Sequence, residues 1–219
     1  MTGLTRRQFG LFAGASTAAL SLPTYLRAQG KPRVVVIGGG AGGATAARYI
    51  AKDSDGAIDV TLIDDSEMFT TCFFSNLYVG GYRSFESITH SYDTLQSSYG
   101  ITKVTGRASS VDRAAKTVTS ADGSSIPYDR LGVSPGIDLI WDSVAGYSEE
   151  LSEIAPHAWK AGPQTQLLKA KLDAIENGQQ ILMVAPPNPY RCPPGPYERA
   201  SMMAHVLKEK GLTDAKVII

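Results

Sequence analysis

The sequence predicts an α/β fold with a Rossmann-type dinucleotide-binding domain, an antiparallel meander and the start of a second Rossmann-like domain. Three observations support this expectation. A buried-type apolar strand runs into a glycine turn and a helix over residues 33–48, short alternating strands follow over residues 101–133, and another apolar strand occupies residues 180–185. With 219 residues, 43% of them hydrophobic, the chain can bury a core.

The glycine turn has the spacing of a dinucleotide-phosphate loop. Residues 33–48 read Arg-Val-Val-Val-Ile-Gly-Gly-Gly-Ala-Gly-Gly-Ala-Thr-Ala-Ala-Arg. Gly38 is expected to allow the tight turn, Gly40 to let backbone N–H groups reach a pyrophosphate, and Gly43 to let helix and strand pack closely. The helix N-terminus adds partial positive charge beside the phosphates.

An acidic residue at the end of the next strand strengthens this prediction. The strand Asp59–Asp64 places a carboxylate about 20 residues past the last glycine, where a ribose hydroxyl would lie. Asp64 is favoured over Asp65 because it directly ends the strand. The alternative, a glycine turn that closes a βαβ unit without a ligand, is disfavoured because strand, glycines, helix and acid occur in the required order.

The segment from Ile101 to Val133 predicts a small meander. The turn Ala121–Ser124 is expected to close one hairpin. Gly132 stands where a buried apolar side chain is expected, at a cost of roughly 1 kcal/mol. A meander after a βαβ opening is typical of flavoproteins with two dinucleotide-binding domains, the glutathione-reductase-like fold, so we expect FAD rather than NAD at the first site. The expected strands are 103–106, 110–112, 116–120 and 126–136.

A second domain is expected to begin after a crossover over residues 137–162. Apolar residues on one face predict a helix over residues 163–176, and the strand Gln180–Ala185 is expected to be buried. Prolines in the following turn, residues 186–200, remove backbone donors that NAD phosphates would need, so no NAD is expected there. The expected domains are 29–162, the FAD-binding domain with the crossover, and 163–219, the start of the second domain. The helix face comprises Leu167, Leu168, Leu172 and Ile175.

The first 28 residues predict a twin-arginine export signal. The stretch Thr5–Phe9 reads Thr-Arg-Arg-Gln-Phe, a mostly apolar run covers residues 10–22, and small or neutral residues extend to Ala28. Arg27 interrupts a run already short for a membrane span, so removal near Ala28 and a periplasmic mature protein are expected. A cytoplasmic amphipathic start is disfavoured because the apolar residues do not share one helical face.

Composition, hydropathy and residue spacing argue against nucleic-acid binding, a membrane span in the mature chain and a metal site. The chain has a formal net charge of zero, and removing residues 1–28 leaves a mildly acidic mature protein. The sequence has no basic cluster interleaved with aromatic residues, as nucleic-acid binding would need, and no mature stretch long enough to cross a bilayer. No metal site is expected, since His157 and His205 lack ligand spacing to another His, Cys or acid pair.

The two cysteines stand in different settings. In an exported protein a structural disulfide between Cys72 and Cys192 is the default from composition, and this alternative stays open. Cys72, however, lies in the loop expected to pass the flavin ring, whereas Cys192 precedes a helix expected to start near Pro196. A thiol near a helix N-terminus and beside Arg191 is favoured as a thiolate, so Cys192 is a candidate catalytic nucleophile.

Three segments closely resemble the flavoprotein subunit of flavocytochrome c sulfide dehydrogenase: residues 71–76, 156–162 and 190–200. The resemblance runs from about Lys31 to the end of the chain. It implies FAD held covalently by the Cys72 sulfur, and a redox-active disulfide between Cys192 and a cysteine much later in the sequence. It also implies that sulfide attacks this disulfide and that electrons pass through FAD to a c-type cytochrome subunit, which alone carries haem.

Two other hypotheses stay open. A sulfide:quinone oxidoreductase-like flavoprotein would pass electrons to a membrane quinone, although the export signal and the flavin-loop cysteine favour the cytochrome-linked form. The chain stops at Ile219, before the family's later cysteine and the late Gly-Asp segment that completes its FAD site, so it is expected to be an N-terminal fragment. A non-catalytic flavin-binding remnant is therefore the third hypothesis.

Overall fold

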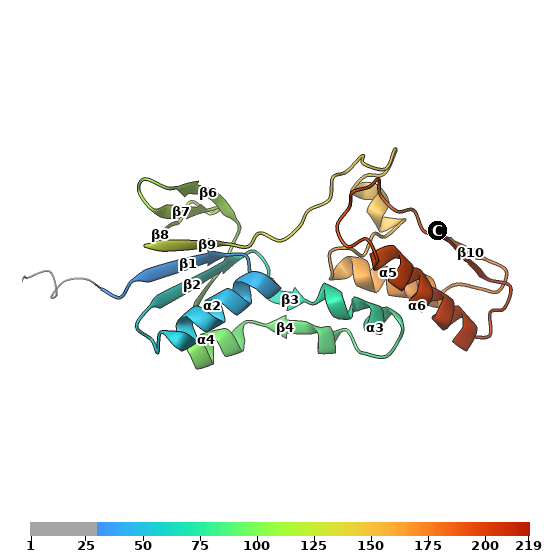
Figure 1. The fold of residues 1–219 in the computed structure, drawn as a ribbon, viewed down its shortest axis with the longest axis horizontal. Helices are drawn as coiled ribbons and strands as arrows, with labels where there is room; N and C mark the ends of the chain where they lie inside the picture. The colour runs from blue at the N-terminus through green and yellow to red at the C-terminus, as the bar shows by residue number, and fades with distance from the viewer. Residues whose placement is uncertain (1–29) are drawn as a thin grey trace, which may run out of the picture.

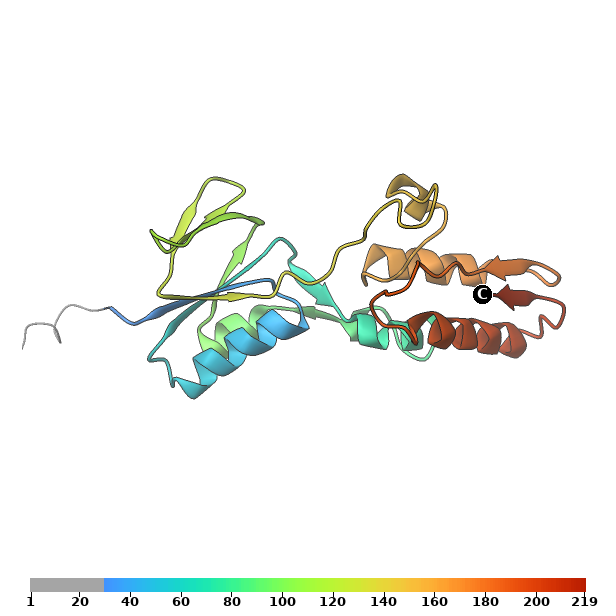
Figure 2. The same ribbon diagram turned by 45° about the horizontal axis from the view of Figure 1, so that its top comes forward.

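The computed structural model describes residues 30–219 and shows two units along one long axis (Figure 1). The predicted export signal lies outside the described residues. The first unit contains a parallel sheet, and the second contains two helices beside a two-stranded sheet. Figure 2 shows two connections between them, a narrow antiparallel ribbon that leads to a short helix, and the crossover segment 134–162.

Four parallel strands form the sheet of the first unit: β1 (Arg33–Ile37), β2 (Asp59–Asp64), β5 (Thr102–Thr105) and β9 (Arg130–Val133). Their order across the sheet is β5-β2-β1-β9. Side chains alternate between the two faces of a strand, so Val34 and Val36 belong to one apolar cluster and Val35 to another. The predicted α/β class is therefore confirmed.

Each face of this sheet is covered by a different layer. Helices α2 (Ala41–Asp53) and α4 (Asp93–Tyr99) lie on one face, where Ala47, Ala51 and Tyr92 pack against Val36 and Leu62. The meander covers the other face with Val118 and Tyr128. Its strands are β6 (Ala108–Asp112), β7 (Thr117–Ser120) and β8 (Ser125–Pro127).

The meander is smaller than predicted. The expected turn at residues 121–124 is confirmed, because it joins β7 to β8 with Gly123 at φ +85°. Placing residues 103–106 in the meander is wrong, since β5 pairs in parallel with β2 from Thr61 and Thr102 onward. The reason is non-local: a short strand of alternating polarity fits either a meander or a sheet edge, and only the free edge of β2 decides between them.

A ribbon and a short helix lead from the first unit toward the second. Strands β3 (Met68–Thr70) and β4 (Thr89–Ser91) pair antiparallel, and a 3₁₀ turn η2 (Cys72–Phe74) leads from β3 into helix α3 (Ser75–Val79). A second 3₁₀ turn, η3 (Glu86–Ile88), returns the chain to β4. Cys72 therefore lies where the chain passes from one unit to the other.

The second unit begins with the predicted helix. Helix α5 (Pro163–Asp173) follows Gly162 and starts with Pro163. Proline is suited to the first turn of a helix. Helix α6 (Gly195–Glu209) begins one residue before Pro196, close to the predicted start. Strands β10 (Gln180–Leu182) and β11 (Lys216–Ile218) pair in parallel, and a 3₁₀ turn η4 (Glu150–Glu153) lies in the crossover.

The prediction of a buried strand over residues 180–185 is wrong in length and in burial. It is only three residues long, and Leu182 and Val184 are 70% and 63% exposed. A parallel strand is buried on both sides only where layers cover both faces. Within residues 30–219, Ile181 and Val217 pack onto the α5 and α6 cluster, while Leu182 faces away from it.

Helix α3 joins the two units through apolar contacts. Val79 is fully buried and clusters with Leu172 of α5 and with Met203, Val206 and Leu207 of α6. The short helix thus belongs to the ribbon of the first unit by sequence and to the core of the second by packing.

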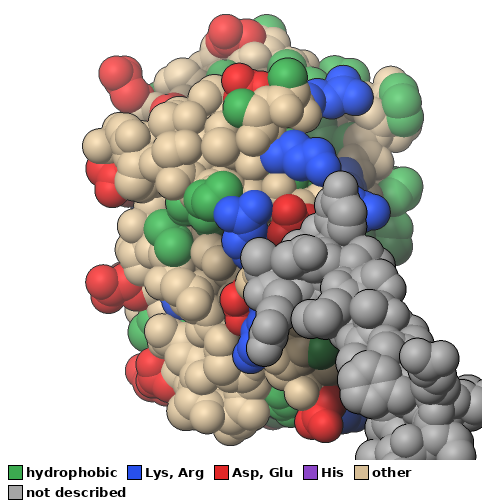
Figure 3. Space-filling model, turned by 90° about the vertical axis from the view of Figure 1, so that its left-hand side faces the viewer, with side chains coloured by type: hydrophobic (Ala, Val, Ile, Leu, Met, Phe, Trp, Pro, Cys, Tyr) green, Lys and Arg blue, Asp and Glu red, His purple; other side chains and the backbone are tan. Residues whose placement is uncertain are grey.

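The surface at the end of the first unit mixes charges of both signs. Figure 3 shows Asp, Glu, Lys and Arg side chains interspersed with hydrophobic ones on this face. Arg33 and Asp129 form an exposed ion pair at 3.3 Å, and Lys31 and Asp59 form one at 3.9 Å. Exposed pairs of this kind contribute little to stability. Within the described part of the chain, no helix combines the length and the apolar character needed to cross a bilayer.

The crossover is ordered around a half-buried histidine. The backbone N–H of Trp159 donates to His157 Nδ1 at 2.9 Å, and the backbone N–H of His157 donates to Gln164 Oε1 at 3.1 Å. The Trp141 ring lies 6.1 Å from the imidazole between centroids. Burial, aided by the charge of Lys160, lowers the pKa of His157 below its ordinary value of 6.5, so the neutral imidazole is the acceptor that this arrangement needs.

Gly132→Ala is expected to stabilise the first unit by about 0.5–1 kcal/mol, because alanine loses less backbone entropy than glycine in a strand. A β-carbon at Gly132 would meet Val36 Cγ2 at 3.5 Å, an ordinary contact. The matched control, Gly38→Ala, should destabilise, since φ there is +98° and the methyl group would overlap the Ser134 carbonyl. Urea unfolding followed by circular dichroism measures both. A Gly132→Ala variant less stable than the parent would contradict this account.

The lowered pKa of His157 predicts a loss of stability in acid. Between pH 6.5 and the lower folded-state pKa, the unfolded chain binds more protons than the folded chain, so the free energy of unfolding falls as pH falls. His157→Gln should flatten this dependence, whereas His90→Gln, an exposed control on β4, should retain it. Urea unfolding between pH 7.5 and 5.5, with tryptophan emission as the probe, tests this. An unchanged slope in His157→Gln would refute it.

Candidate functional site

The glycine turn after β1 is held by close backbone contacts. The Gly38 N–H donates to the Ile63 carbonyl at 2.8 Å, which ties the turn to β2. A β-carbon at Gly38 would overlap the Ser134 carbonyl, and one at Gly43 would overlap the carbonyl of Gly38. Only glycine fits these two positions, as a tight turn and close packing of helix on strand require.

The N-terminus of α2 is open toward the turn. Gly40 caps this helix in an extended conformation without a side-chain hydrogen bond, and the first turn contains no acidic residue. A β-carbon at Gly40 would meet only the Phe69 ring, at 3.7 Å. Within residues 30–219 no side chain caps the first N–H groups, so they can receive phosphate oxygens.

Asp64 contacts the glycine turn directly. Its Oδ2 accepts the Gly39 N–H at 2.5 Å, and its Oδ1 accepts the Ser66 N–H at 2.9 Å. The structure therefore brings the acid and the three predicted glycines together at the carboxyl edge of the sheet, where ligands bind in open α/β folds. That these four residues bind a dinucleotide stays a prediction.

Sequence reasoning missed Tyr92, which supports the turn from the other side. Its hydroxyl donates to the Gly39 carbonyl at 3.1 Å, and Lys103 Nζ lies 4.9 Å from its ring centroid. Burial raises the pKa of Tyr92 to about 12, with the charge of Asp64 adding to the shift, so the hydroxyl stays a donor. Tyr92 precedes helix α4, and only the folded sheet brings it beside Gly39.

Cys72 lies at the start of the η2 turn with its thiol free and exposed. The preceding residue, Thr71, is buried and donates its N–H to the Ile88 carbonyl at 2.8 Å. The Cys72 carbonyl accepts the Ser75 hydroxyl at 2.6 Å. The backbone on both sides of the thiol is thus fixed, although Cys72 itself is exposed.

Cys192 is also free and exposed, so the two cysteines do not form the disulfide that composition allows. It adopts φ +62°, an unusual conformation for a residue other than glycine, and its carbonyl accepts the Gly195 N–H at 2.9 Å, directly before α6. A β-carbon at Gly195 would lie 3.3 Å from Cys192 Sγ and 3.1 Å from Trp159 Cη2. Trp159 of the crossover, not expected at this site from the sequence, therefore stands near the thiol.

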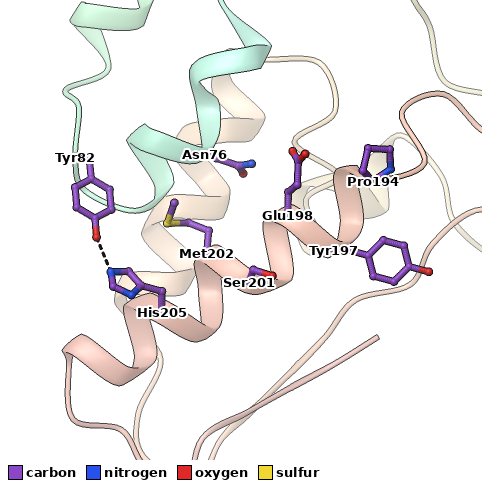
Figure 4. A pocket seen from close by; sticks show the side chains of 8 residues that line it. All are labelled: Asn76, Tyr82, Pro194, Tyr197, Glu198, Ser201, Met202 and His205. Carbon is purple, nitrogen blue, oxygen red and sulfur yellow. Dashed lines mark hydrogen bonds between the residues drawn. The ribbon is translucent and has the colours of Figure 1, made fainter.

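A groove runs along α6 beside these loops. Its volume is about 560 Å³, and Figure 4 shows the Tyr82 hydroxyl pointing to His205 Nε2, its hydrogen-bond partner at 2.5 Å. Among residues 30–219, no cluster of His, Cys, Asp or Glu has the arrangement of a metal site. The groove is lined by Asn76, Tyr82, Pro194, Tyr197, Glu198, Ser201, Met202 and His205.

Comparison with curated proteins finds relatives that handle sulfide. The chain is 33% identical over 182 residues to the sulfide-quinone reductase of Aquifex aeolicus, covering 82% of this chain and 40% of that protein. It is 53% identical over 47 residues to the sulfide dehydrogenase (flavocytochrome c) flavoprotein chain of Chlorobaculum thiosulfatiphilum, covering 22% of this chain and 96% of that sequence. The chain thus spans about two fifths of the length of the quinone-reducing relative.

Solved structures show the same fold. The Aquifex aeolicus sulfide:quinone oxidoreductase superimposes with a TM-score of 0.67 at 27% identity, over 84% of this chain and 42% of that one. Putidaredoxin reductase, in its covalent complex with putidaredoxin, superimposes with a TM-score of 0.60 at 13% identity, over 86% and 50%. This second likeness concerns the fold alone.

Two family matches divide the chain. Residues 165–219 match the central part of the sulfide dehydrogenase (flavocytochrome c) flavoprotein chain. Together with the Chlorobaculum relative, this match confirms the resemblance to the flavocytochrome c flavoprotein subunit that the sequence motifs indicated. Residues 32–155, which include the glycine turn and the meander, match the pyridine nucleotide-disulphide oxidoreductase family. The chain therefore belongs to the pyridine nucleotide-disulphide oxidoreductase family.

Proposed function

We propose that this chain is part of a flavoprotein subunit that oxidises sulfide with FAD and passes the electrons to a c-type cytochrome subunit. One observation carries the proposal: Cys192 precedes α6 in the unit whose residues 165–219 match the flavocytochrome c family. The chain spans only part of its relatives, so the activity belongs to the whole protein. We propose the periplasm as the site of this activity, on the basis of the export signal predicted from residues 1–28.

The first unit is built to hold the FAD. The open N-terminus of α2 and the bare backbone at Gly40 suit a pyrophosphate, while Asp64 stands at the edge where ribose hydroxyls would lie. The ribbon then carries Cys72 away from this edge, so that its sulfur can form a covalent link to the flavin. When bound, FAD supplies a centre that takes electrons in pairs and releases them singly.

Cys192 is the proposed sulfide-handling residue. In a longer form of the protein it would form a disulfide with a later cysteine. Hydrosulfide attacks the Cys192 sulfur, a new S–S bond forms there, and the later cysteine leaves as a thiolate with the electron pair of the broken bond. The start of α6 adds partial positive charge beside the loop, and the prolines of residues 186–196 leave few backbone donors for NAD phosphates.

A sulfide:quinone oxidoreductase is the second candidate, because the Aquifex aeolicus relative and its solved structure match most of this chain. The two functions differ only in the acceptor. Reoxidation of the sulfide-reduced protein by a soluble c-type cytochrome supports the first proposal. Reoxidation by a short-chain quinone alone replaces it with the second.

The Cys72 link predicts a covalent flavin. Because a carbon–sulfur bond to the flavin would survive denaturation, the denatured holoprotein should keep a mass increase close to that of FAD, and Cys72→Ser should lose it. Intact-mass spectrometry after acid denaturation measures this, with Cys192→Ser as the matched control. Flavin fully released from the parent protein would rule out the link.

Cys192→Ser in the complete protein should abolish reduction of the flavin by sulfide, since a hydroxyl cannot take part in disulfide exchange. The covalent flavin at Cys72 should stay. Stopped-flow absorbance of the flavin gives the rate, and dithionite reduction of the same sample checks that the flavin is competent. Sulfide-driven reduction at the parent rate would remove Cys192 from the mechanism.

A further inference from the structure

Arg199 is a mostly buried cation for which residues 30–219 provide no ion pair. It projects from α6 toward α3, where its Nη2 donates to Ser75 Oγ at 2.9 Å. Its Nη1 is buried and has no hydrogen-bond partner in the described part of the chain. A buried charge without a carboxylate partner is costly, so a further anionic partner is expected.

The Arg199 hydrogen bond leads to the backbone of Cys72. Ser75 is 2% exposed, and its hydroxyl accepts from Arg199 while donating to the Cys72 carbonyl at 2.6 Å. A hydroxyl can accept and donate at once, so the three groups form a continuous chain. Arg199 thereby fixes the turn from which the Cys72 thiol projects.

The guanidinium charge also lies close to Cys72, because only the Ser75 hydroxyl separates Arg199 Nη2 from the Cys72 carbonyl. Burial is the main cause that lowers the pKa of Arg199, and the neighbouring Cys72 and Glu198 act in the opposite direction. A cation close to an exposed thiol promotes its reaction as a nucleophile. The neighbouring carboxylate, Glu198, is exposed and forms no salt bridge with Arg199 in the described residues.

We propose that Arg199 is the positioning residue of Cys72: through Ser75 it fixes the η2 turn, and through its charge it makes the Cys72 thiol a better nucleophile. Helix α6 is then adjacent to both cysteines: it begins just after Cys192, and its Arg199 side chain is linked through Ser75 to the Cys72 carbonyl. The role of Cys72 in flavin attachment belongs to the proposed function, but the reactivity of the thiol can be measured without it.

The test compares alkylation of the two cysteines within one sample. The 219-residue chain, in fractions where intact mass shows no covalent group on Cys72, is treated with iodoacetamide at pH 7.5. Peptide mass spectrometry then gives the rate ratio of Cys72 to Cys192. Arg199→Met should lower this ratio about tenfold, whereas Arg199→Lys, which keeps the charge, should stay within about threefold of the parent.

Two further variants separate this role from a merely structural one. Tyr82→Phe breaks another side-chain contact to α6, the bond to His205, and should leave the ratio unchanged. Ser75→Ala removes the bridge and should lower the ratio about threefold, which provides a result even where Arg199→Met unfolds. Equal ratios in Arg199→Met and Tyr82→Phe, or equal losses in the Met and Lys variants, would overturn the proposal. A Cys72 that never binds flavin would refute the proposed function and leave this result intact.

Discussion

The burial of helix α3 between the two units is the constraint on which the arrangement of the two cysteines depends. Val79 is fully buried against α5 and α6, and burying one such side chain contributes about 1.5–3 kcal/mol. Helix α3 continues directly from the turn that carries Cys72, while α6 continues directly from the loop that carries Cys192. Apolar packing therefore fixes both thiol-bearing loops, although neither loop has a core of its own.

The glycine turn depends on a different constraint, close backbone approach. Gly38 faces the Ser134 carbonyl and Gly43 faces the Gly38 carbonyl at separations that leave no space for a β-carbon. The Tyr92 hydroxyl donates to the Gly39 carbonyl, and the Asp64 carboxylate accepts the Gly39 N–H. Both polar groups of that peptide segment are satisfied, so the turn is held in shape before any phosphate arrives.

The sequence predicted those features that short-range chemistry determines. Glycine spacing fixed the turn, proline at a first helical turn marked the starts of α5 and α6, and a turn with Gly123 marked the hairpin. Features that depend on distant partners were missed. The pairing of β5 with β2, the contact of Tyr92 with Gly39 and the burial of Arg199 against Ser75 join residues far apart in the chain.

Arg199 shows why such long-range polar contacts escape a reading of local pattern. At the start of an amphipathic helix, an arginine next to Glu198 is typical of a solvated face, and nothing in its neighbours signals burial. The fold turns this side of α6 toward α3, so the charge loses water and, among residues 30–219, its side chain gains only the hydrogen bond to Ser75. Val79, Met203 and Val206 form one apolar cluster that holds α6 against α3. The same packing that holds the two units together thus permits a desolvated cation beside Cys72.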